Sequence, residues 1–310
     1  MTIESGDYRL FRDFLERSCG IVLGDGKEYL VKSRVGNLMR EQGIGTLGEL
    51  ARRLESTQQR QLRKSVLDAM TTNETMWFRD GYPFDILRER LLPELARSKQ
   101  RVRIWSAACS SGQEPYSIAM VVEEYLSSQL AAFAGGIEIV ATDLSSQVLQ
   151  QAQSGIYAES ALARGLSLER RKRFFDPVEG GYQVKPAVRG RISFRQINLL
   201  EDFTALGNFD LIFCRNVLIY FRMELKREIL RRLRGRLKPG GSLLLGASET
   251  TLDLGHCYQM EYCNPGVIHG ACLTLLAASA GKKVPCRASG RLARVCRSRL
   301  HSTTSLYNSL

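Results

Sequence analysis

The chain has 310 residues, 44% of them apolar, and a formal net charge of +12, which is enough apolar material for one large domain or two smaller ones. No apolar run reaches the roughly 18 residues of a membrane-spanning helix. The N-terminal segment has charges in place of an apolar signal core, so we expect a cytoplasmic protein without membrane insertion. Eight cysteines with no C-x-x-C pair and three histidines argue against a zinc site or a disulfide framework, and we assign no metal ligands.

Residues 1–75 are predicted to form an all-helical domain. Apolar residues recur with helical spacing in four segments between residues 8 and 70. Thr46 and Glu49 have the spacing of a capping box at the start of the third segment. The bundle is rich in cations, which form either an ordinary solvated surface or a docking face for an acidic partner. These cations are Lys32, Arg34, Arg40, Arg52, Arg53, Arg60, Arg63 and Lys64.

Between residues 76 and 270 the pattern changes to alternating strands and helices, which is typical of a mostly parallel, doubly wound α/β sheet. In such folds ligands bind at the carboxyl ends of the strands. Strands are predicted at Arg101–Ala107, Ile137–Thr142, Ile192–Ile197, Phe209–Cys214 and Ser242–Gly246, and helices at Ile118–Leu126, Ser146–Gln153 and Glu224–Leu237.

Two further regions depart from this alternation. Pro and Gly punctuate short β-like runs at about residues 174–195, which predicts a small inserted antiparallel hairpin with strands at Tyr182–Val184 and Ile192–Phe194. Residues 271–310 carry seven Lys and Arg, no Asp or Glu, and no sustained periodicity, so we expect a basic, disordered tail. The remaining, modest basic excess still favours an acidic partner.

The segment Trp105–Ser117 is the most informative stretch, because it combines a strand, a turn of small residues and the start of a helix. Small residues let a ligand approach the backbone, and Glu114 places a carboxylate beside that approach. A phosphate-binding turn favours glycines and no acid. This turn instead suits a nucleoside with hydroxyls and a positive charge, such as S-adenosylmethionine. An ordinary tight connection between strand and helix is the alternative interpretation.

Four more segments carry polar residues at strand ends or between domains: Thr71–Asp80, Asp143, Phe213–Phe221 and Leu237–Glu249. Each alone has an ordinary structural interpretation. Together, and in this order, they resemble the chemotaxis-receptor methyltransferase family, CheR, over about residues 8–270. The most specific blocks are Thr-Thr-Asn-Glu-Thr, Ser-Gly-Gln-Glu-Pro-Tyr-Ser and Cys-Arg-Asn-Val-Leu-Ile-Tyr-Phe.

The resemblance implies a Rossmann-like class I methyltransferase sheet, preceded by a helical receptor-docking domain and carrying a small inserted antiparallel β subdomain. It further implies methyl transfer from S-adenosylmethionine to glutamates on the cytoplasmic methylation helices of bacterial chemoreceptors, which yields methyl esters and S-adenosylhomocysteine. The hairpin at Asp176–Tyr182 looks shorter than in family members that bind a receptor peptide, so we expect a peptide-independent enzyme. We also expect a monomer.

The family's cofactor-binding residues carry over onto matching positions. Glu114 matches the acid near the methionine end of the cofactor, and Asp143 matches the acid that holds the ribose hydroxyls, as the chemistry of a strand-end carboxylate also predicts. The other matches are Asn73, Thr75 and Arg79 from the linker, Asn198 and Leu199 beside the adenine, and Arg215 and Asn216 at the active-site strand end.

Arg79, Arg215 and Tyr220 are the expected catalytic residues. A carboxylate is ionised at neutral pH, so methyl transfer to it needs no general base and rests on alignment and exclusion of water. We expect Arg79 to orient the incoming glutamate through charge-assisted hydrogen bonds. Tyr220 would contact either the sulfonium or the target carboxylate.

The sequence departs from the family at Gln113, which replaces an acid, and beyond Ile268, where the resemblance ends. The sequence leaves three alternative functions. The first is a nucleic-acid methyltransferase of the same fold. The sequence shows no strip of aromatic and basic residues on which bases could stack, so no specific nucleic-acid partner is expected. A non-catalytic cofactor-binding docking module is a second alternative. The third keeps the chemistry but places the receptor in a non-flagellar signalling pathway.

Overall fold

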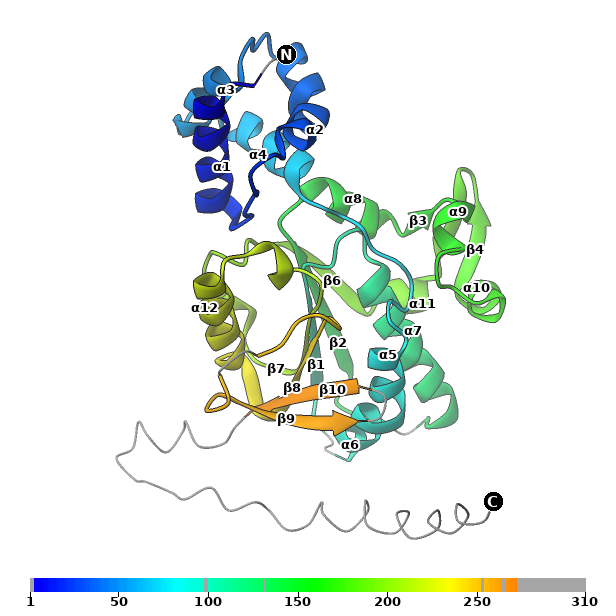
Figure 1. Cartoon of the computed structure of the whole chain (residues 1–310). Coiled ribbons are helices and arrows are strands. Elements are labelled where there is room, and N and C mark those ends of the chain that lie inside the picture. Colours follow the sequence, from blue (N-terminus) through cyan, green and yellow to red (C-terminus); the bar gives the residue numbers. More distant parts are fainter. Residues whose placement is uncertain (1–2, 98–99, 131, 252–253, 264–265, 272–310) are drawn as a thin grey trace, which may run out of the picture. The chain divides into compact units, whose positions relative to one another are not determined.

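The computed structural model describes residues 3–97, 100–130, 132–251, 254–263 and 266–271. Helices dominate the first part of the chain, and strands alternate with helices in the rest (Figure 1). The expected basic tail lies outside the described residues, apart from Ala271, which ends a strand. Among the described residues, no helix is long and apolar enough to cross a membrane.

Four amphipathic helices form the N-terminal bundle. The capping box begins the third, where the Thr46 side chain accepts a hydrogen bond from the Glu49 amide at 3.1 Å. The Glu49 carboxylate accepts from the Gly45 amide at 3.0 Å, one residue earlier than in the standard motif. The core consists of the apolar stripes that the helical spacing indicated, including Phe11, Leu15 and Val35. The helices are α1 (Ser5–Cys19), α2 (Glu28–Glu41), α3 (Leu47–Glu55) and α4 (Arg60–Met70).

The second part of the chain is built on a seven-stranded sheet in the order β6-β2-β1-β7-β8-β10-β9. The first five strands in this order are parallel, and β10 is antiparallel to both of its neighbours. This is the doubly wound, class I methyltransferase sheet that we expected, so the fold prediction is confirmed. The strands are β1 (Val102–Ala107), β2 (Ile137–Asp143), β6 (Ile192–Gln196), β7 (Phe209–Cys214), β8 (Leu237–Leu245), β9 (Tyr258–Cys263) and β10 (Gly266–Ala271).

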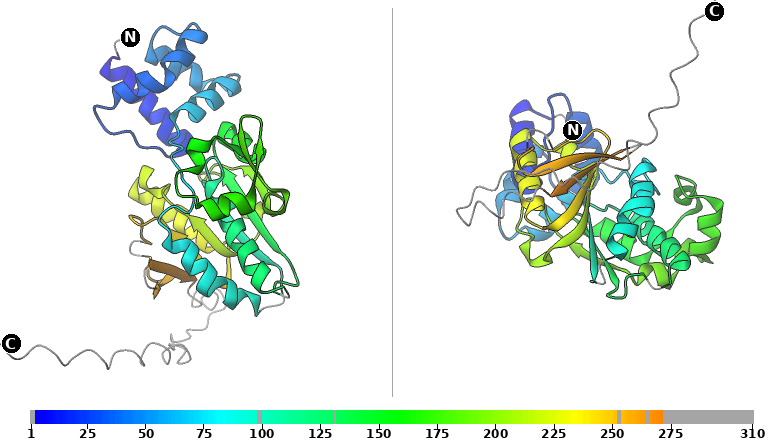
Figure 2. Two further views of the ribbon diagram at one scale, coloured as in Figure 1. Left: turned by 90° about the vertical axis from the view of Figure 1, so that its right-hand side faces the viewer. Right: turned by 90° about the horizontal axis from the view of Figure 1, so that it is seen from below.

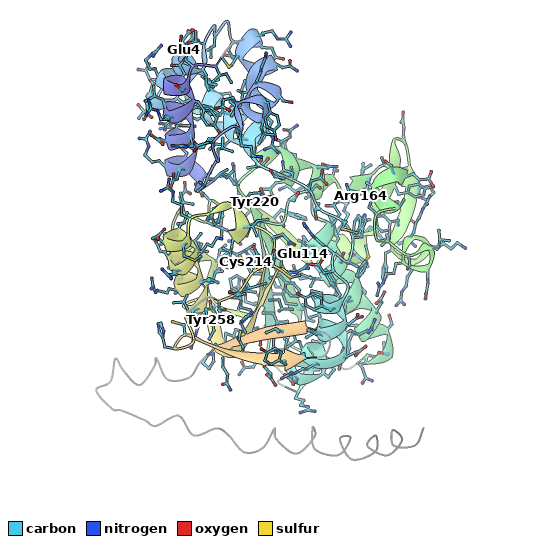
Figure 3. All side chains as sticks on the ribbon, viewed as in Figure 1. Glu4, Glu114, Arg164, Cys214, Tyr220 and Tyr258 are labelled. Atoms are coloured by element: carbon cyan, nitrogen blue, oxygen red, sulfur yellow. The ribbon has the colours of Figure 1, made fainter. Side chains whose placement is uncertain are left out.

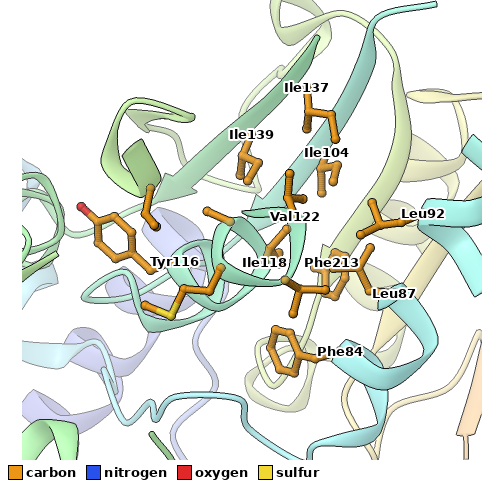
Figure 4. Close-up of a cluster of buried hydrophobic side chains, with 14 of the residues drawn as sticks. Phe84, Leu87, Leu92, Ile104, Tyr116, Ile118, Val122, Ile137, Ile139 and Phe213 are labelled. Carbon is orange, nitrogen blue, oxygen red and sulfur yellow. The ribbon is translucent and has the colours of Figure 1, made fainter. Parts of the chain in front are cut away.

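Helices cover both faces of the sheet, because successive strand residues point to opposite faces. Ile104 packs on one face with α7 and α5 (Figure 4), whereas the next residue, Trp105, packs on the other with α12. Figures 1 and 2 show these helices on opposite sides of the sheet. The covering helices are α5 (Tyr82–Ile86), the π-helical turn η1 (Leu87–Leu91), α6 (Leu92–Ala96), α7 (Gln113–Ser128), α8 (Ser146–Ser154) and α12 (Met223–Arg234).

Two of our expectations about these elements were wrong. Helix α12 ends at Arg234 instead of Leu237, and β8 begins at Leu237, which pairs with Phe209 of β7, instead of at Ser242. The stretch Lys238–Gly241, which separates the predicted helix from the predicted strand, therefore lies within β8, where the pairing with β7 shifts register. The inserted hairpin also differs, because Ile192–Phe194 pairs in parallel with β2 as the edge of the main sheet.

The insertion is instead a three-stranded antiparallel sheet in the order β3-β5-β4. The first of these strands lies before the region in which we placed the hairpin. The small sheet comprises β3 (Ile156–Tyr157), β4 (Phe175–Val178) and β5 (Gly181–Val184), and short helices accompany it or follow the main strands: α9 (Glu159–Leu162), α10 (Leu168–Phe174), α11 (Pro186–Arg189), η2 (Thr204–Leu206) and η3 (Leu218–Tyr220).

The insertion packs against the linker that follows the bundle. Trp77 is fully buried against Tyr157 and Phe175, and its amide donates to the Arg164 carbonyl at 3.1 Å. Gly165 adopts a φ of +96°, and a Cβ there would collide with the Trp77 carbonyl oxygen. Only glycine fits this close approach of two backbones.

We therefore expect Gly165→Ala to lower the free energy of unfolding by about 2 kcal/mol more than Gly180→Ala, because overpacking adds to backbone strain. Gly180 is the matched control, since its φ is +82° but a Cβ there would meet nothing within 4 Å. Chemical denaturation of both variants measures the difference. Equal losses of stability would contradict the close-packing argument.

Candidate functional site

A cavity open to solvent lies at the carboxyl ends of β1, β2 and β7, where the end of α1 and the linker after α4 also line it. This is the edge at which doubly wound sheets bind ligands. The structure brings all ten predicted site residues to this cavity, although their individual roles remain predictions. They are Asn73, Thr75, Arg79, Glu114, Asp143, Asn198, Leu199, Arg215, Asn216 and Tyr220.

The turn after β1 brings backbone to the cavity. Ala108 and Ser110 line it with positive φ angles of 56° and 51°, a conformation that L residues rarely adopt. The Ser110 amide donates to Asp143 at 2.8 Å and so ties this turn to the end of β2. Small side chains in this conformation leave space beside the backbone, as the sequence predicted.

Asp143 is a buried carboxylate held by backbone amides. Its Oδ2 accepts from the Ser110 amide, and its Oδ1 accepts from the Ser145 amide at 2.9 Å. Burial raises the pKa of Asp143, while these amide donors oppose the rise. Each carboxylate oxygen can accept more than one hydrogen bond, so Asp143 keeps acceptor capacity toward the cavity.

Arg215 lies at the centre of the site, with its side chain 1% exposed. Its Nη1 donates to Glu114 at 3.0 Å, and its Nη2 donates to Asp80 at 2.6 Å. Burial raises the pKa of Glu114, and Arg215 opposes that rise. The buried Nε of Arg215 has no hydrogen-bond partner among the described residues. Arg215 lines the cavity, so an unsatisfied donor on its side chain fits a ligand that brings an acceptor, such as a carboxylate.

Arg79 lies on a strained segment at the edge of the cavity. Phe78, Asp80 and Gly81 all have positive φ angles, and Arg215 Nη2 donates to the Arg79 carbonyl at 2.9 Å, which holds the segment in place. The Arg79 guanidinium donates to the Glu74 carbonyl at 3.2 Å. In the described part of the chain its other donors have no partner, so they are available to a ligand.

Tyr220 faces the same cavity from η3, and Figure 3 labels it together with Glu114. Its carbonyl accepts from the Val22 amide at 3.0 Å, which links the active-site strand end to the segment after α1. Within the described ranges its hydroxyl has no hydrogen-bond partner. The hydroxyl is therefore a free donor and acceptor at the cavity.

The amide group of Asn198 already makes hydrogen bonds within the protein. Its Nδ2 donates to the Ser18 carbonyl at 2.8 Å, and its Oδ1 accepts from the Leu200 amide at 3.1 Å. The side chain therefore joins the end of α1 to the loop after β6, and its role toward a ligand is confined to its remaining donor and lone pair. Leu199 beside it is buried.

Sequence reasoning gave no role to two acids near the site. Asp80 pairs with Arg215, and Glu249 accepts from the amides of Asn216, Leu218 and Gly246. Both residues stood at the ends of segments that we singled out, Thr71–Asp80 and Leu237–Glu249. The pattern located them but could not show which groups they contact.

The structure also divides the basic residues of the bundle into two groups. Arg34 donates to the Met70 carbonyl at 2.6 Å, and Arg63 donates to the Leu54 carbonyl, so both hold backbone within the bundle. Arg53 pairs with Glu49. The other predicted cations have no carboxylate partner among the described residues and remain available to an acidic partner: Lys32, Arg40, Arg52, Arg60 and Lys64.

The residues of the cavity fit S-adenosylmethionine. Asp143 retains acceptor capacity for vicinal hydroxyls, and Glu114 provides a carboxylate for a cationic group. The unpartnered Arg215 Nε provides a donor for a carboxylate on the same ligand. A nucleoside with a charged amino-acid end has these groups in one molecule.

Comparison with known proteins agrees with this chemistry. Residues 73–265 match the family described as "CheR methyltransferase, SAM binding domain", and residues 6–71 match "CheR methyltransferase, all-alpha domain". Together the two matches span most of the chain.

Curated relatives give the same result. The chain is 55% identical over 274 residues to "Chemotaxis protein methyltransferase 1" of Pseudomonas aeruginosa, covering 87% of this chain and 100% of the relative. It is 53% identical to "Chemotaxis protein methyltransferase Cher2" of Pseudomonas putida, covering 86% and 98%. It is 35% identical to the "Chemotaxis protein methyltransferase" of Escherichia coli, covering 80% and 86%.

The buried ion pairs of Arg215 generate a stability prediction. We expect Arg215→Met to lower the free energy of unfolding by about 3 kcal/mol, because it leaves Glu114 and Asp80 without their cation. Arg17→Met is the control, since the exposed Arg17–Glu55 pair contributes about 0–1 kcal/mol. Urea denaturation compares the two. A loss at Arg215 no larger than at Arg17 would contradict the central position of this residue.

Proposed function

Because the chain belongs to the CheR methyltransferase family, and is therefore an S-adenosylmethionine-dependent methyltransferase of chemotaxis, we propose that its substrates are glutamate side chains of chemoreceptors, which it converts to methyl esters. One observation carries the proposal: Arg79, with donors that no described residue uses, lines the same cavity as Asp143, Glu114 and Arg215. A cation at that place can align a carboxylate beside a bound cofactor.

The residues predicted to bind the cofactor would do so through the hydrogen-bonding groups that the protein itself does not use. Bound S-adenosylmethionine supplies a methyl group activated on a sulfonium. Asp143 would accept hydrogen bonds from the ribose hydroxyls, and Arg215 would hold the methionyl carboxylate. Glu114 would pair with the ammonium group. Asn73, Thr75, Asn198, Leu199 and Asn216 complete the wall around the cofactor.

The chain's own residues contribute alignment and desolvation to the chemical step. The Arg79 guanidinium binds one oxygen of the substrate glutamate and leaves the other free to attack. No group needs to remove a proton, because a glutamate is ionised at neutral pH. Tyr220 closes the cavity with a hydroxyl that can contact the sulfonium or the substrate carboxylate. Holding the two reactants in line and excluding water supplies the rate enhancement.

The helical bundle is the docking domain in this proposal, acting in the cytoplasm on the methylation helices of a receptor. Its five cations without carboxylate partners complement a glutamate-rich helix electrostatically. In this proposal the enzyme acts as a monomer. It also acts without a receptor-derived peptide, since the β4–β5 turn contains only Glu179 and Gly180 between the paired Val178 and Gly181.

The test uses methyl-labelled S-adenosylmethionine, the purified full-length protein and receptor-containing membranes of its host. We expect label on receptor protein that mild alkali releases as methanol, because carboxyl methyl esters are alkali-labile. Alkali-stable label, or label on nucleic acid, would contradict the glutamate assignment. Absence of label while S-adenosylhomocysteine binds would favour a non-catalytic docking module.

A second prediction addresses the substrate-orienting role of Arg79. Arg79→Ala should lower kcat/KM for the receptor by about 10²-fold, since alignment of the carboxylate is lost. Arg79→Lys should retain part of the rate, because it keeps the charge without the planar fork. Arg97→Ala, at an exposed arginine after α6, serves as the control. Full activity of Arg79→Ala in the same labelling assay would refute the assignment.

A further inference from the structure

Glu249 makes three short hydrogen bonds to backbone amides at the active-site edge of the sheet. Its Oε2 accepts from the Asn216 amide at 2.7 Å and from the Gly246 amide at 2.8 Å. Its Oε1 accepts from the Leu218 amide at 2.8 Å. One carboxylate therefore joins the ends of two neighbouring strands, β7 and β8. Such bonds are charge-assisted and stronger than those between neutral groups.

The segment that Glu249 holds is strained and lines the cavity. Asn216 has a φ of +58°, a left-handed conformation that L residues rarely adopt. Strained backbone of this kind persists only where surrounding contacts fix it. Gly246 approaches so closely that a Cβ there would lie 2.7 Å from Glu249 Oε2 and 2.9 Å from the Asn216 nitrogen. The fit leaves little freedom for the segment that leads to Tyr220.

We propose that Glu249 is a positioning residue for methyl transfer, which fixes the Asn216–Tyr220 segment and so sets the place of Tyr220 at the cavity. Glu249 does not itself line the cavity, whereas Asn216 and Tyr220 do. The role rests on the proposed methyl transfer, but the positioning of the segment can be measured without any receptor.

The neighbouring Arg215 allows a positioning role of Glu249 to be distinguished from a general loss of stability. Arg215 is held by Glu114 and Asp80, independently of Glu249. Loss of the Glu249 carboxylate should therefore leave Arg215, Glu114 and Asp143 in place beside the cofactor, while the segment from Asn216 to Tyr220 loses its position. Binding of S-adenosylhomocysteine and turnover should respond differently, which uniform destabilisation of the protein would not produce.

The experiment compares Glu249→Ala and Glu249→Gln with the wild-type full-length protein. We expect the amides of Asn216, Leu218 and Gly246 to exchange hydrogen faster in Glu249→Ala, because their acceptor is gone. In the labelling assay kcat should fall roughly ten- to hundredfold, while the Kd of S-adenosylhomocysteine changes by less than about threefold. The kcat of Glu249→Gln should lie between those of the wild type and Glu249→Ala, since glutamine keeps the shape of the side chain and one acceptor oxygen.

Asp202→Asn is the matched control, because Asp202 also accepts from a loop amide, that of Thr204 at 2.9 Å, but does not line the cavity. Its kcat should equal that of the wild type. Unchanged exchange and kcat in both Glu249 variants would overturn the inference, as would equal losses of kcat and cofactor affinity. If Glu249→Ala does not fold, Glu249→Gln decides. If the wild type labels no receptor, the proposed function fails, and amide exchange alone decides whether Glu249 fixes the segment.

Discussion

The buried guanidinium of Arg215 is the constraint on which the site depends. A cation that is almost fully removed from water must be matched by carboxylates, and Arg215 is matched by Glu114 and Asp80. Glu114 lies in the first turn of α7, Asp80 lies in the linker after the bundle, and Arg215 follows β7. One charge network therefore gathers three distant parts of the chain. The same guanidinium holds the Arg79 carbonyl, so the strained linker cannot move independently of the sheet.

Some polar groups of the cavity are used in hydrogen bonds within the protein, whereas others are left available to a ligand. Asp143 and Asn198 each make two hydrogen bonds to backbone groups, which fixes their orientation. Arg79 and Tyr220 keep donors that no described residue uses. Oriented groups with spare capacity bind a ligand without a large cost in side-chain entropy. Burial makes each remaining contact stronger than it would be in water, because the local dielectric is low.

Most of the fold could be predicted from the sequence, because the spacing of apolar residues and the residues that favour turns are local signals. The five parallel strands and the four-helix bundle follow from such patterns. The Lys238–Gly241 stretch misled us, since Pro and Gly usually mark a turn, whereas here strand pairing with β7 overrides that preference. Ile192–Ile197 was predicted as a strand of the main sheet, and its first three residues also as a strand of the inserted hairpin; only the parallel pairing with β2, a long-range contact, decides for the main sheet. Asp80 and Glu249 gained their roles only from partners far away in sequence.

The cavity wall crosses the boundary between the two matched family segments. Cys19 and Ile21 line it from the end of α1, and residues Thr71–Met76 line it from the linker. The Val22 amide donates to the Tyr220 carbonyl, and the Ser18 carbonyl accepts from Asn198, so the end of α1 is bonded directly to the sheet domain. In the proposed function the bundle docks the receptor and the cavity holds the cofactor, so exchanging whole bundles between relatives would also exchange part of the cavity wall. A chimera made to test that proposal needs its crossover points outside these segments, within α2 to α4, so that the cavity wall stays whole.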